Sequence, residues 1–370
     1  MHLQSIKLNN FKNYSEIDLG FSNNINCFVG NNGVGKTNLM DAIYYLSFSK
    51  SYFNSVDSQN IKYGESFFAI HGNYSMPDCE ELQMVSCVQR REGGKQLKFN
   101  KKAYQRFSDH IGKIPLVMIS PYDQDLINAG SDMRRKFLDG IISQTDRQYL
   151  DTLIRYQKSV EQRNALLKQF CENRFFEEEQ LKLWDEQLVR LGTPIFERRK
   201  EFLKDFEDLF QQYFTLISSS AEKVSVFYDS QLNSADFSEA LQEAWKKDSY
   251  AQHTSVGVHK DDLVFQIDDG MPIKKFGSQG QQKTFVLALK LAQFEYIAQV
   301  RKMKPILLLD DVFDKLDIER VRQLIHLVGS DRFGQVFLTD TQQGRVEAIF
   351  ENTEIEHAVF TISGNNITQI

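Results

Sequence analysis

The feature that most constrains this chain is a glycine-rich loop set between an apolar stretch and a stretch with helical spacing. The loop matches G-x-x-x-x-G-K-[ST] at every fixed position. Its residues are Gly30, Asn31, Asn32, Gly33, Val34, Gly35, Lys36 and Thr37. Such a loop directs backbone N–H groups at phosphate oxygens, and the helix after it directs its positive end at the same anion. Residues 25–29 form the expected strand and residues 38–46 the expected helix, so a nucleotide-phosphate site is favoured over a chance glycine-rich turn.

Two side chains of the loop have predicted roles. Lys36 can reach the β- and γ-phosphates, and the Thr37 hydroxyl can bind Mg²⁺. The second half of such a site is an acid at the carboxyl end of a buried strand. The apolar run 306–309, followed by Asp310 and Asp311, meets this need, although an ordinary acidic turn is the alternative. We predict that Lys36, Asp310 and Asp311 are catalytic, with Asp310 holding Mg²⁺ through water and Asp311 orienting the attacking water.

A third segment indicates which class of phosphate-loop protein this is. Ser278, Gly280 and Gln281 stand just before an expected helix at 283–300 and upstream of the acidic strand. They resemble the signature motif of ABC-type ATPases. That resemblance implies that Ser278 and Gly280 contact the γ-phosphate held by another subunit, so that ATP lies between two copies.

Two more segments resemble parts of the same class. Asp314 and Asp317 resemble the D-loop that follows the acidic strand. Thr339 to Thr341 lies where the switch-histidine loop would be, and it contains no histidine. Each match is weak alone, and their order along the chain makes them strong together.

The change between strand-like and helical sequence patterns along the chain predicts two domains. Residues 3–104 have a strand-like pattern, with strands at 67–74 and 82–88 and a hairpin turned by Gly93 and Gly94. After residue 224 strands return, and a helix at 318–328 and a strand at 335–339 complete an α/β alternation. We predict an α/β, ABC-type head, with a mixed sheet and an antiparallel β layer, from residues 1–120 and 255–370. Residues 121–254 would form an inserted α-helical arm domain.

The middle of the chain, about 134–213, has a helical pattern. A heptad-like seam predicts its second helix, and a looser seam predicts the first, with a tip near 171–179. Gly192 and Pro194 predict an interruption and a kink in the second helix. Either two core helices of a bundle or a short projecting antiparallel arm would fit. The second seam is Leu181, Trp184, Leu188, Leu191, Ile195 and Phe202, and the first is Leu150, Leu153, Val160 and Leu167.

Segments along nearly the whole chain resemble the RecF family of bacterial recombination mediators, which have ABC/SMC-like ATPase heads. Besides the loop, the signature and the acidic strand, they are 8–14, 120–123, 134–139, 162–168 and 257–263. The resemblance implies a cytoplasmic protein that uses ATP and Mg²⁺, forms an ATP-dependent homodimer and binds DNA at gaps or single-strand/double-strand junctions. It further implies RecA loading with RecR and RecO, replication restart, and SOS induction.

The same resemblance bears on single residues. Lys12 and Asn13 resemble a nucleotide-contacting segment of related heads, although an ordinary strand turn would also fit. Many ABC ATPases have Glu where this chain has Asp311, so we expect a weak, DNA-stimulated ATPase. Lys12, Tyr122, Val258 and Lys260 depart from residues that are frequent in the family, and these departures keep the charge or shape of the segments.

DNA contact needs a local positive patch, because the formal net charge of the chain is −6. The window 90–106 is the strongest candidate, with a solvated strand face as the alternative. Its candidates are Arg90, Arg91, Lys95, Lys98, Lys101 and Lys102; Arg134 and Arg135 are a second group, and residues 198–200 a weaker third. Contacts to phosphate alone predict steep salt dependence and little sequence preference.

Composition excludes several classes of protein. The 29 Phe and 14 Tyr argue against disorder, and no apolar run approaches the about 18 residues that cross a bilayer. The four cysteines lack paired spacing, which favours reduced thiols over a zinc site. The remaining alternatives are a transporter's nucleotide-binding subunit, a Rad50/SMC-type head with another partner, and a scaffold that binds ATP without hydrolysing it.

Overall fold

The computed structural model describes the whole chain except residues 78, 174, 219–221, 269, 313–323, 345–349, 351–354 and 365. The chain divides into two units, Met1–Asp123 with Gln293–Ile370, and Gln124–Ala292. The boundary falls within helix α9 (Gln279–Arg301). The predicted division differs for residues 255–292, which it assigns to the head. In the structure this stretch packs in the second unit, because strand β10 (Asp262–Ile267) pairs along its length with β9 (Val224–Asp229).

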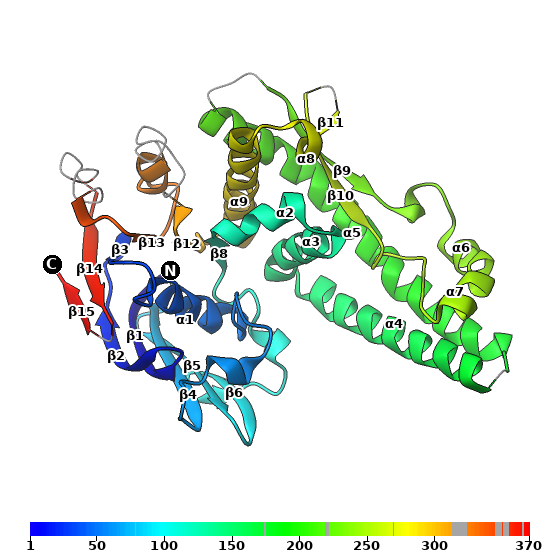
Figure 1. Ribbon diagram of the computed structural model, residues 1–370, viewed down its shortest axis with the longest axis horizontal. Coiled ribbons are helices and arrows are strands. Elements are labelled where there is room, and N and C mark those ends of the chain that lie inside the picture. Colours follow the sequence, from blue (N-terminus) through cyan, green and yellow to red (C-terminus); the bar gives the residue numbers. More distant parts are fainter. Residues whose placement is uncertain are drawn as a thin grey trace. The chain divides into compact units, whose positions relative to one another are not determined.

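The described residues of the first unit form two sheets, and each has six strands. Figure 1 shows their strands. The antiparallel sheet has the order β2-β1-β4-β5-β6-β7. The other has the order β15-β14-β3-β13-β12-β8, and within it only β14 and β15 are antiparallel neighbours. The strands of the antiparallel sheet are β1 (His2–Phe11), β2 (Tyr14–Gly20), β4 (Phe67–Ser75), β5 (Gln83–Arg90), β6 (Gly94–Phe99) and β7 (Lys102–Ala103). Those of the mixed sheet are β3 (Ile25–Val29), β8 (Leu116–Ile119), β12 (Ile306–Leu309), β13 (Val336–Asp340), β14 (His357–Ser363) and β15 (Asn366–Gln369).

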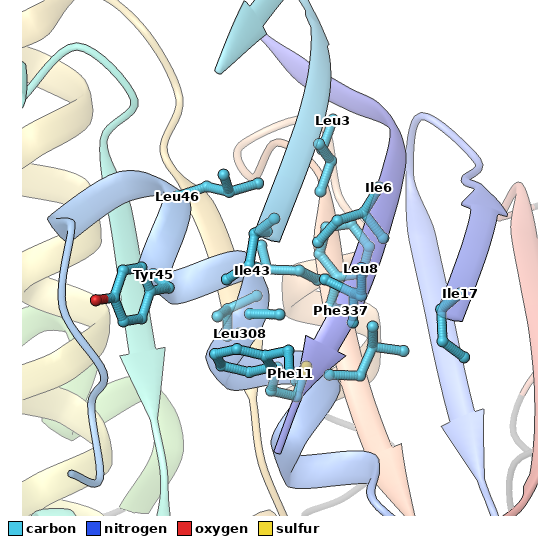
Figure 2. Close-up of a cluster of buried hydrophobic side chains, with 14 of the residues drawn as sticks. Leu3, Ile6, Leu8, Phe11, Ile17, Ile43, Tyr45, Leu46, Leu308 and Phe337 are labelled. Carbon is cyan, nitrogen blue, oxygen red and sulfur yellow. The ribbon is translucent and has the colours of Figure 1, made fainter. Parts of the chain in front are cut away.

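Helix α1 (Lys36–Phe48) is the centre of this unit, because it contacts strands of both sheets. Ile43 and Leu46 of the helix join side chains from β1, β12 and β13 in one apolar cluster, as Figure 2 shows. Strands β3, β12 and β13 are buried at every position, as expected for parallel strands covered on both faces. The core therefore fixes the loop between β3 and α1 against the carboxyl ends of β12 and β13.

Several predicted elements of the first unit are confirmed. The strand, loop and helix come in the predicted order, with β3 ending at Val29 and α1 beginning at Lys36. The predicted hairpin is the β5–β6 pair, in which Arg90 lies opposite Gly94. The predicted helix at 318–328 lies partly outside the described residues.

The second unit contains the two long helices that the seams predict, α4 (Arg147–Asn173) and α5 (Glu178–Ser218). They pack against each other, and α5 also packs against β9 (Figure 1). Its sheet has the order β11-β10-β9. The remaining elements are α2 (Asp125–Asn128), α3 (Ser131–Thr145), α6 (Phe237–Glu243), α7 (Trp245–Ala251), β11 (Met271–Pro272) and α8 (Ile273–Phe276).

Gly192 and Pro194 do not interrupt α5, which contradicts the prediction of a break. A Cβ at Gly192 would lie 2.6 Å from Cε1 of Phe237 and 2.9 Å from Cε2 of Tyr156. The glycine therefore lets α6 and α4 approach the helix closely. Within the part of the chain that the structure describes, no helix is both long and apolar enough to cross a membrane.

Candidate nucleotide-phosphate site

The phosphate loop has a backbone that requires glycine at two crowded positions. Gly35 has a φ of 113°, and a Cβ there would lie 2.6 Å from Nδ2 of Asn13. A Cβ at Gly30 would lie 2.5 Å from the carbonyl oxygen of Ile362. The loop can therefore close tightly at both ends of the turn only because these residues have no side chain.

Lys36 lies inside the loop. Its side chain is buried, and Nζ donates to the carbonyl oxygens of Gly30 at 2.7 Å and Asn31 at 3.0 Å. The ammonium group therefore lies within the turn, at the start of α1. This is where a lysine of this motif meets the terminal phosphates of a nucleotide.

The acidic strand meets the loop as predicted. The Thr37 hydroxyl donates to Oδ1 of Asp310 at 3.1 Å, across 273 positions of sequence. A hydroxyl beside a carboxylate fits Mg²⁺, which takes oxygen ligands, keeps several waters and binds phosphate oxygens. No group of three or more His, Cys, Asp or Glu side chains in the described residues could hold a metal ion by itself. The oxygens of Thr37 and Asp310 would instead fit Mg²⁺ that is also bound to the phosphates of a nucleotide.

The carboxylate of Asp310 has a perturbed pKa. Burial and the neighbouring carboxylate of Asp311 together raise its pKa to about 6. The hydrogen bonds from Thr339 and Thr37 act in the opposite direction. A buried carboxylate beside a second acid attracts a cation strongly.

Thr339 is a site residue whose role the sequence analysis missed. Its Oγ1 donates to Oδ1 of Asp310 at 3.0 Å and accepts the backbone N–H of Asp311 at 2.8 Å. Oγ1 also lies 3.3 Å from Oδ1 of Asp311. The available signal was a polar residue at the carboxyl end of the strand expected beside the acidic strand. In the sequence, Thr339 is simply the first residue of the loop that lacks a histidine.

Lys12 and Asn13 lie at the turn between β1 and β2. Nζ of Lys12 pairs with Oδ2 of the buried Asp41 on α1 at 2.6 Å, so its charge is already balanced. Asn13 accepts from Nδ2 of Asn38 at 2.7 Å and donates to the carbonyl oxygen of Val34 at 3.4 Å. Both residues therefore brace α1 or the loop, and nucleotide contact by them stays a prediction.

Tyr14 braces the loop as well, although it is not among the predicted site residues. Its hydroxyl donates to the carbonyl oxygen of Gly35 at 2.9 Å. Nothing in the local sequence pattern marks this tyrosine.

The signature segment lies in the second unit. Oγ of Ser278 accepts the N–H of Gln281 at 3.2 Å, and the N–H of Ser278 donates to Oε1 of Gln281 at 2.7 Å. This reciprocal pair is a capping box at the start of α9. A Cβ at Gly280 would meet only Oγ of Ser278, at 3.9 Å, so packing within the chain does not require the glycine. The D-loop candidates Asp314 and Asp317 lie outside the described residues.

The basic hairpin has two faces. Arg90, Arg91, Lys101 and Lys102 are exposed, and Lys98 is half-buried. Lys95 faces the core instead: its Nζ lies 2.6 Å from both Oδ2 of Asp57 and the carbonyl oxygen of Ser49. The physical reason is strand alternation, since Lys95 shares its face of β6 with the buried Leu97.

The second group of DNA candidates is engaged in internal contacts. Arg134 binds both carboxylate oxygens of Asp262, at 2.7 and 2.9 Å. Arg135 donates to the carbonyl oxygen of Asp261 at 2.6 Å. These arginines hold α3 against the start of β10, so a role in DNA binding would compete with these bonds.

Comparison with known proteins places this geometry in a family. The family model described as RecF/RecN/SMC N terminal domain matches residues 2–362. The DNA replication and repair protein RecF of Flavobacterium johnsoniae is 51% identical over 362 residues, covering 98% of this chain and all of the relative. The protein of the same description from Phocaeicola vulgatus is 47% identical over 370 residues, covering 100% of this chain and 98% of the relative.

Solved structures agree with these relatives. The recombination mediator protein RecF of the RecFOR pathway, solved as RecF-ATP, has a TM-score of 0.90 at 28% identity, covering 100% of this chain and 97% of that one. A Smc head bound to the C-winged helix domain of ScpA has a TM-score of 0.59 at 15% identity, covering 100% of this chain and 97% of that one, which concerns the fold alone. The predicted α/β, ABC-type head fold is thereby confirmed, and with relatives about half identical over its full length, the chain belongs to the RecF family.

Proposed function

We propose that this protein is an ATP-controlled DNA-binding switch that acts as a recombination mediator in DNA replication and repair. The observation that carries the proposal is the bond between Thr37 and Asp310 at the mouth of a loop that encloses Lys36. A nucleoside triphosphate with Mg²⁺ needs these groups, and the fold brings them together from two distant segments of the chain. The ATP-bound structure of a RecF relative that is similar over its full length supports the same ligand.

The site residues divide the work of hydrolysis. Loop N–H groups bind phosphate oxygens, and Lys36 exchanges the carbonyls of Gly30 and Asn31 for the β- and γ-phosphates. Thr37 and Asp310 would hold Mg²⁺, which neutralises charge on the phosphate oxygens when bound. Asp311 orients the attacking water. Its side chain is one methylene shorter than glutamate, so we expect slow turnover. The slow hydrolysis of ATP would then set how long the dimer stays on DNA. We also expect DNA to stimulate this turnover.

A second copy of the chain would complete the site. Ser278 and Gly280 are exposed, and Gly280 has open space around it, which leaves room for a phosphate of another subunit. The positive end of the 23-residue helix α9 adds to the attraction for that anion. ATP therefore joins two protomers, with the signature Ser278, Gly280 and Gln281 acting across the dimer.

The dimer would bind DNA at gaps or single-strand/double-strand junctions through phosphate contacts. By family relationship it would work in the cytoplasm with RecR and RecO, loading RecA and supporting replication restart and the SOS response. A Rad50/SMC-type head with another partner is the second candidate, because the Smc head shares the fold. The much higher identity to RecF relatives favours the mediator.

Sedimentation with Mg²⁺ tests the proposal, with and without ATP and with and without a gapped duplex. We expect ATP to drive the wild type to a dimer that retains DNA. Lys36→Arg should weaken nucleotide binding, and Ser278→Arg should bind ATP but stay monomeric. Ser234→Arg, at another exposed serine of the second unit, is the matched control and should behave as the wild type. A wild type that stays monomeric with saturating ATP and DNA would contradict the proposal.

A further inference from the structure

Thr339 lies where two parallel strands end together. Leu309 of β12 pairs with Leu338 of β13, so Asp310 and Thr339 are the next residues on neighbouring strands. Both side chains are buried, with Thr339 fully so. The core of the first unit thus holds this hydroxyl beside the two acids.

The hydroxyl contacts each acid in a different way. It donates to Oδ1 of Asp310, the same oxygen that accepts from Thr37. Two hydroxyls on one oxygen therefore set the direction of the carboxylate.

The contact to Asp311 acts through the backbone. Asp311 has a φ of 48°, in the left-handed region that non-glycine residues adopt at a cost. Its N–H donates to Oγ1 of Thr339 at 2.8 Å, and this bond holds the residue in that conformation. The backbone conformation sets the direction of the Asp311 side chain, and hence the position at which its carboxylate can hold a water.

We propose that Thr339 is a positioning residue that orients Asp310 and Asp311 together, coupling the metal-binding acid to the water-orienting acid. The inference rests on the proposed ATPase function and adds a residue to it. A hydroxyl is suited to the task because it donates one hydrogen bond and accepts others at once. Valine has nearly the same shape and can do neither, whereas serine retains both.

The test compares ATP affinity with the rate of hydrolysis. For Thr339→Val we expect the single-turnover rate to fall by roughly 10- to 100-fold, because misplaced catalytic groups cost about that much. The Kd for ATP with Mg²⁺ should change less than about threefold, since the loop and Lys36 are untouched. Thr339→Ser should restore most of the rate. Thr368→Val, an exposed threonine of the same sheet, is the control and should leave the rate unchanged.

The outcomes separate the inference from the function on which it rests. A Thr339→Val protein with a wild-type rate would overturn the inference, as would equal losses of affinity and rate or a serine variant that is not rescued. If the valine variant does not fold, Thr339→Ala against Thr339→Ser gives the same comparison. A wild type without turnover would overturn the ATPase proposal itself, and the inference with it.

Discussion

At the scale of single residues, His110 is a buried titratable group whose neighbours fix its proton. Its Nε2 lies 2.6 Å from the carbonyl oxygen of Leu46, which can only accept, so Nε2 carries the hydrogen. Nδ1, at 3.2 Å, then accepts from the Tyr104 hydroxyl. Burial lowers the pKa of His110 to about 4. The neutral ring is therefore part of the folded state.

This arrangement predicts a pH-dependent stability. An unfolded histidine titrates near pH 6.5, so between about pH 6.5 and pH 4 the unfolded chain binds more protons and stability falls as pH falls. We expect the protonation of His110 in the unfolded chain to lower the free energy of unfolding by about 2 kcal/mol when the pH falls from 7 to 5. His110→Gln, whose amide can still donate to Leu46, should lose correspondingly less. Urea unfolding at the two pH values measures this, and equal pH dependence in both proteins would refute it.

Single residues also show what the sequence could predict. The phosphate loop was predictable because its residues are contiguous and their spacing is dictated by one ligand. Thr339 was not, because its role depends on a neighbour in space that comes from another strand. The charge of Lys95 makes it a candidate for DNA contact, yet its alternation with the buried Leu97 along β6 indicates an inward face. Charge alone does not say which side of a strand a lysine occupies.

At the scale of elements, α4 and α5 form a seam that contains an ion cluster. Arg163 is fully buried, and its Nε and Nη1 lie 2.6 Å from carboxylate oxygens of Asp185 and Asp248. Its Nη1 also donates to the Thr254 hydroxyl at 3.1 Å. The apolar seam predicted the helix pair, but the arginine could not be placed because Asp248 comes from α7. The cluster ties α7 and the following loop to both long helices.

Removing the arginine should therefore unfold this region readily. Arg163→Met leaves two buried carboxylates without their partner, a change that costs about 3–5 kcal/mol. We expect a lower melting temperature and faster proteolysis within the second unit. Arg155→Met, at an exposed position of the same helix, is the control and should change stability little. An Arg163→Met protein as stable as this control would mean that the cluster contributes nothing net.

At the scale of the whole molecule, the sequence pattern predicts the α/β, ABC-type head, because segments with strand and helix periodicity alternate along the chain. It could not place residues 255–292, because β10 pairs with β9 across residues 230–261. That stretch consists of loops and short helices and has no strong sequence pattern. The chain carries a net charge of −6, so any DNA contact must be local. The exposed lysines of the β6–β7 hairpin are such a local group, because Lys95 faces inward while Lys101 and Lys102 do not.

Salt dependence tests whether this hairpin meets DNA. Each phosphate contact contributes about 0.9 to the slope of log K against log salt concentration on duplex DNA. Lys101→Gln with Lys102→Gln should therefore weaken ATP-dependent binding and lower the slope by about 2 for each protomer whose hairpin contacts the DNA, without changing sequence preference. Fluorescence anisotropy with a gapped duplex at several salt concentrations measures both. Lys204→Gln with Lys302→Gln removes the same charge from exposed positions elsewhere and should leave the slope nearly unchanged. If the two double variants behave alike, only net charge matters, and the DNA contact lies on another surface.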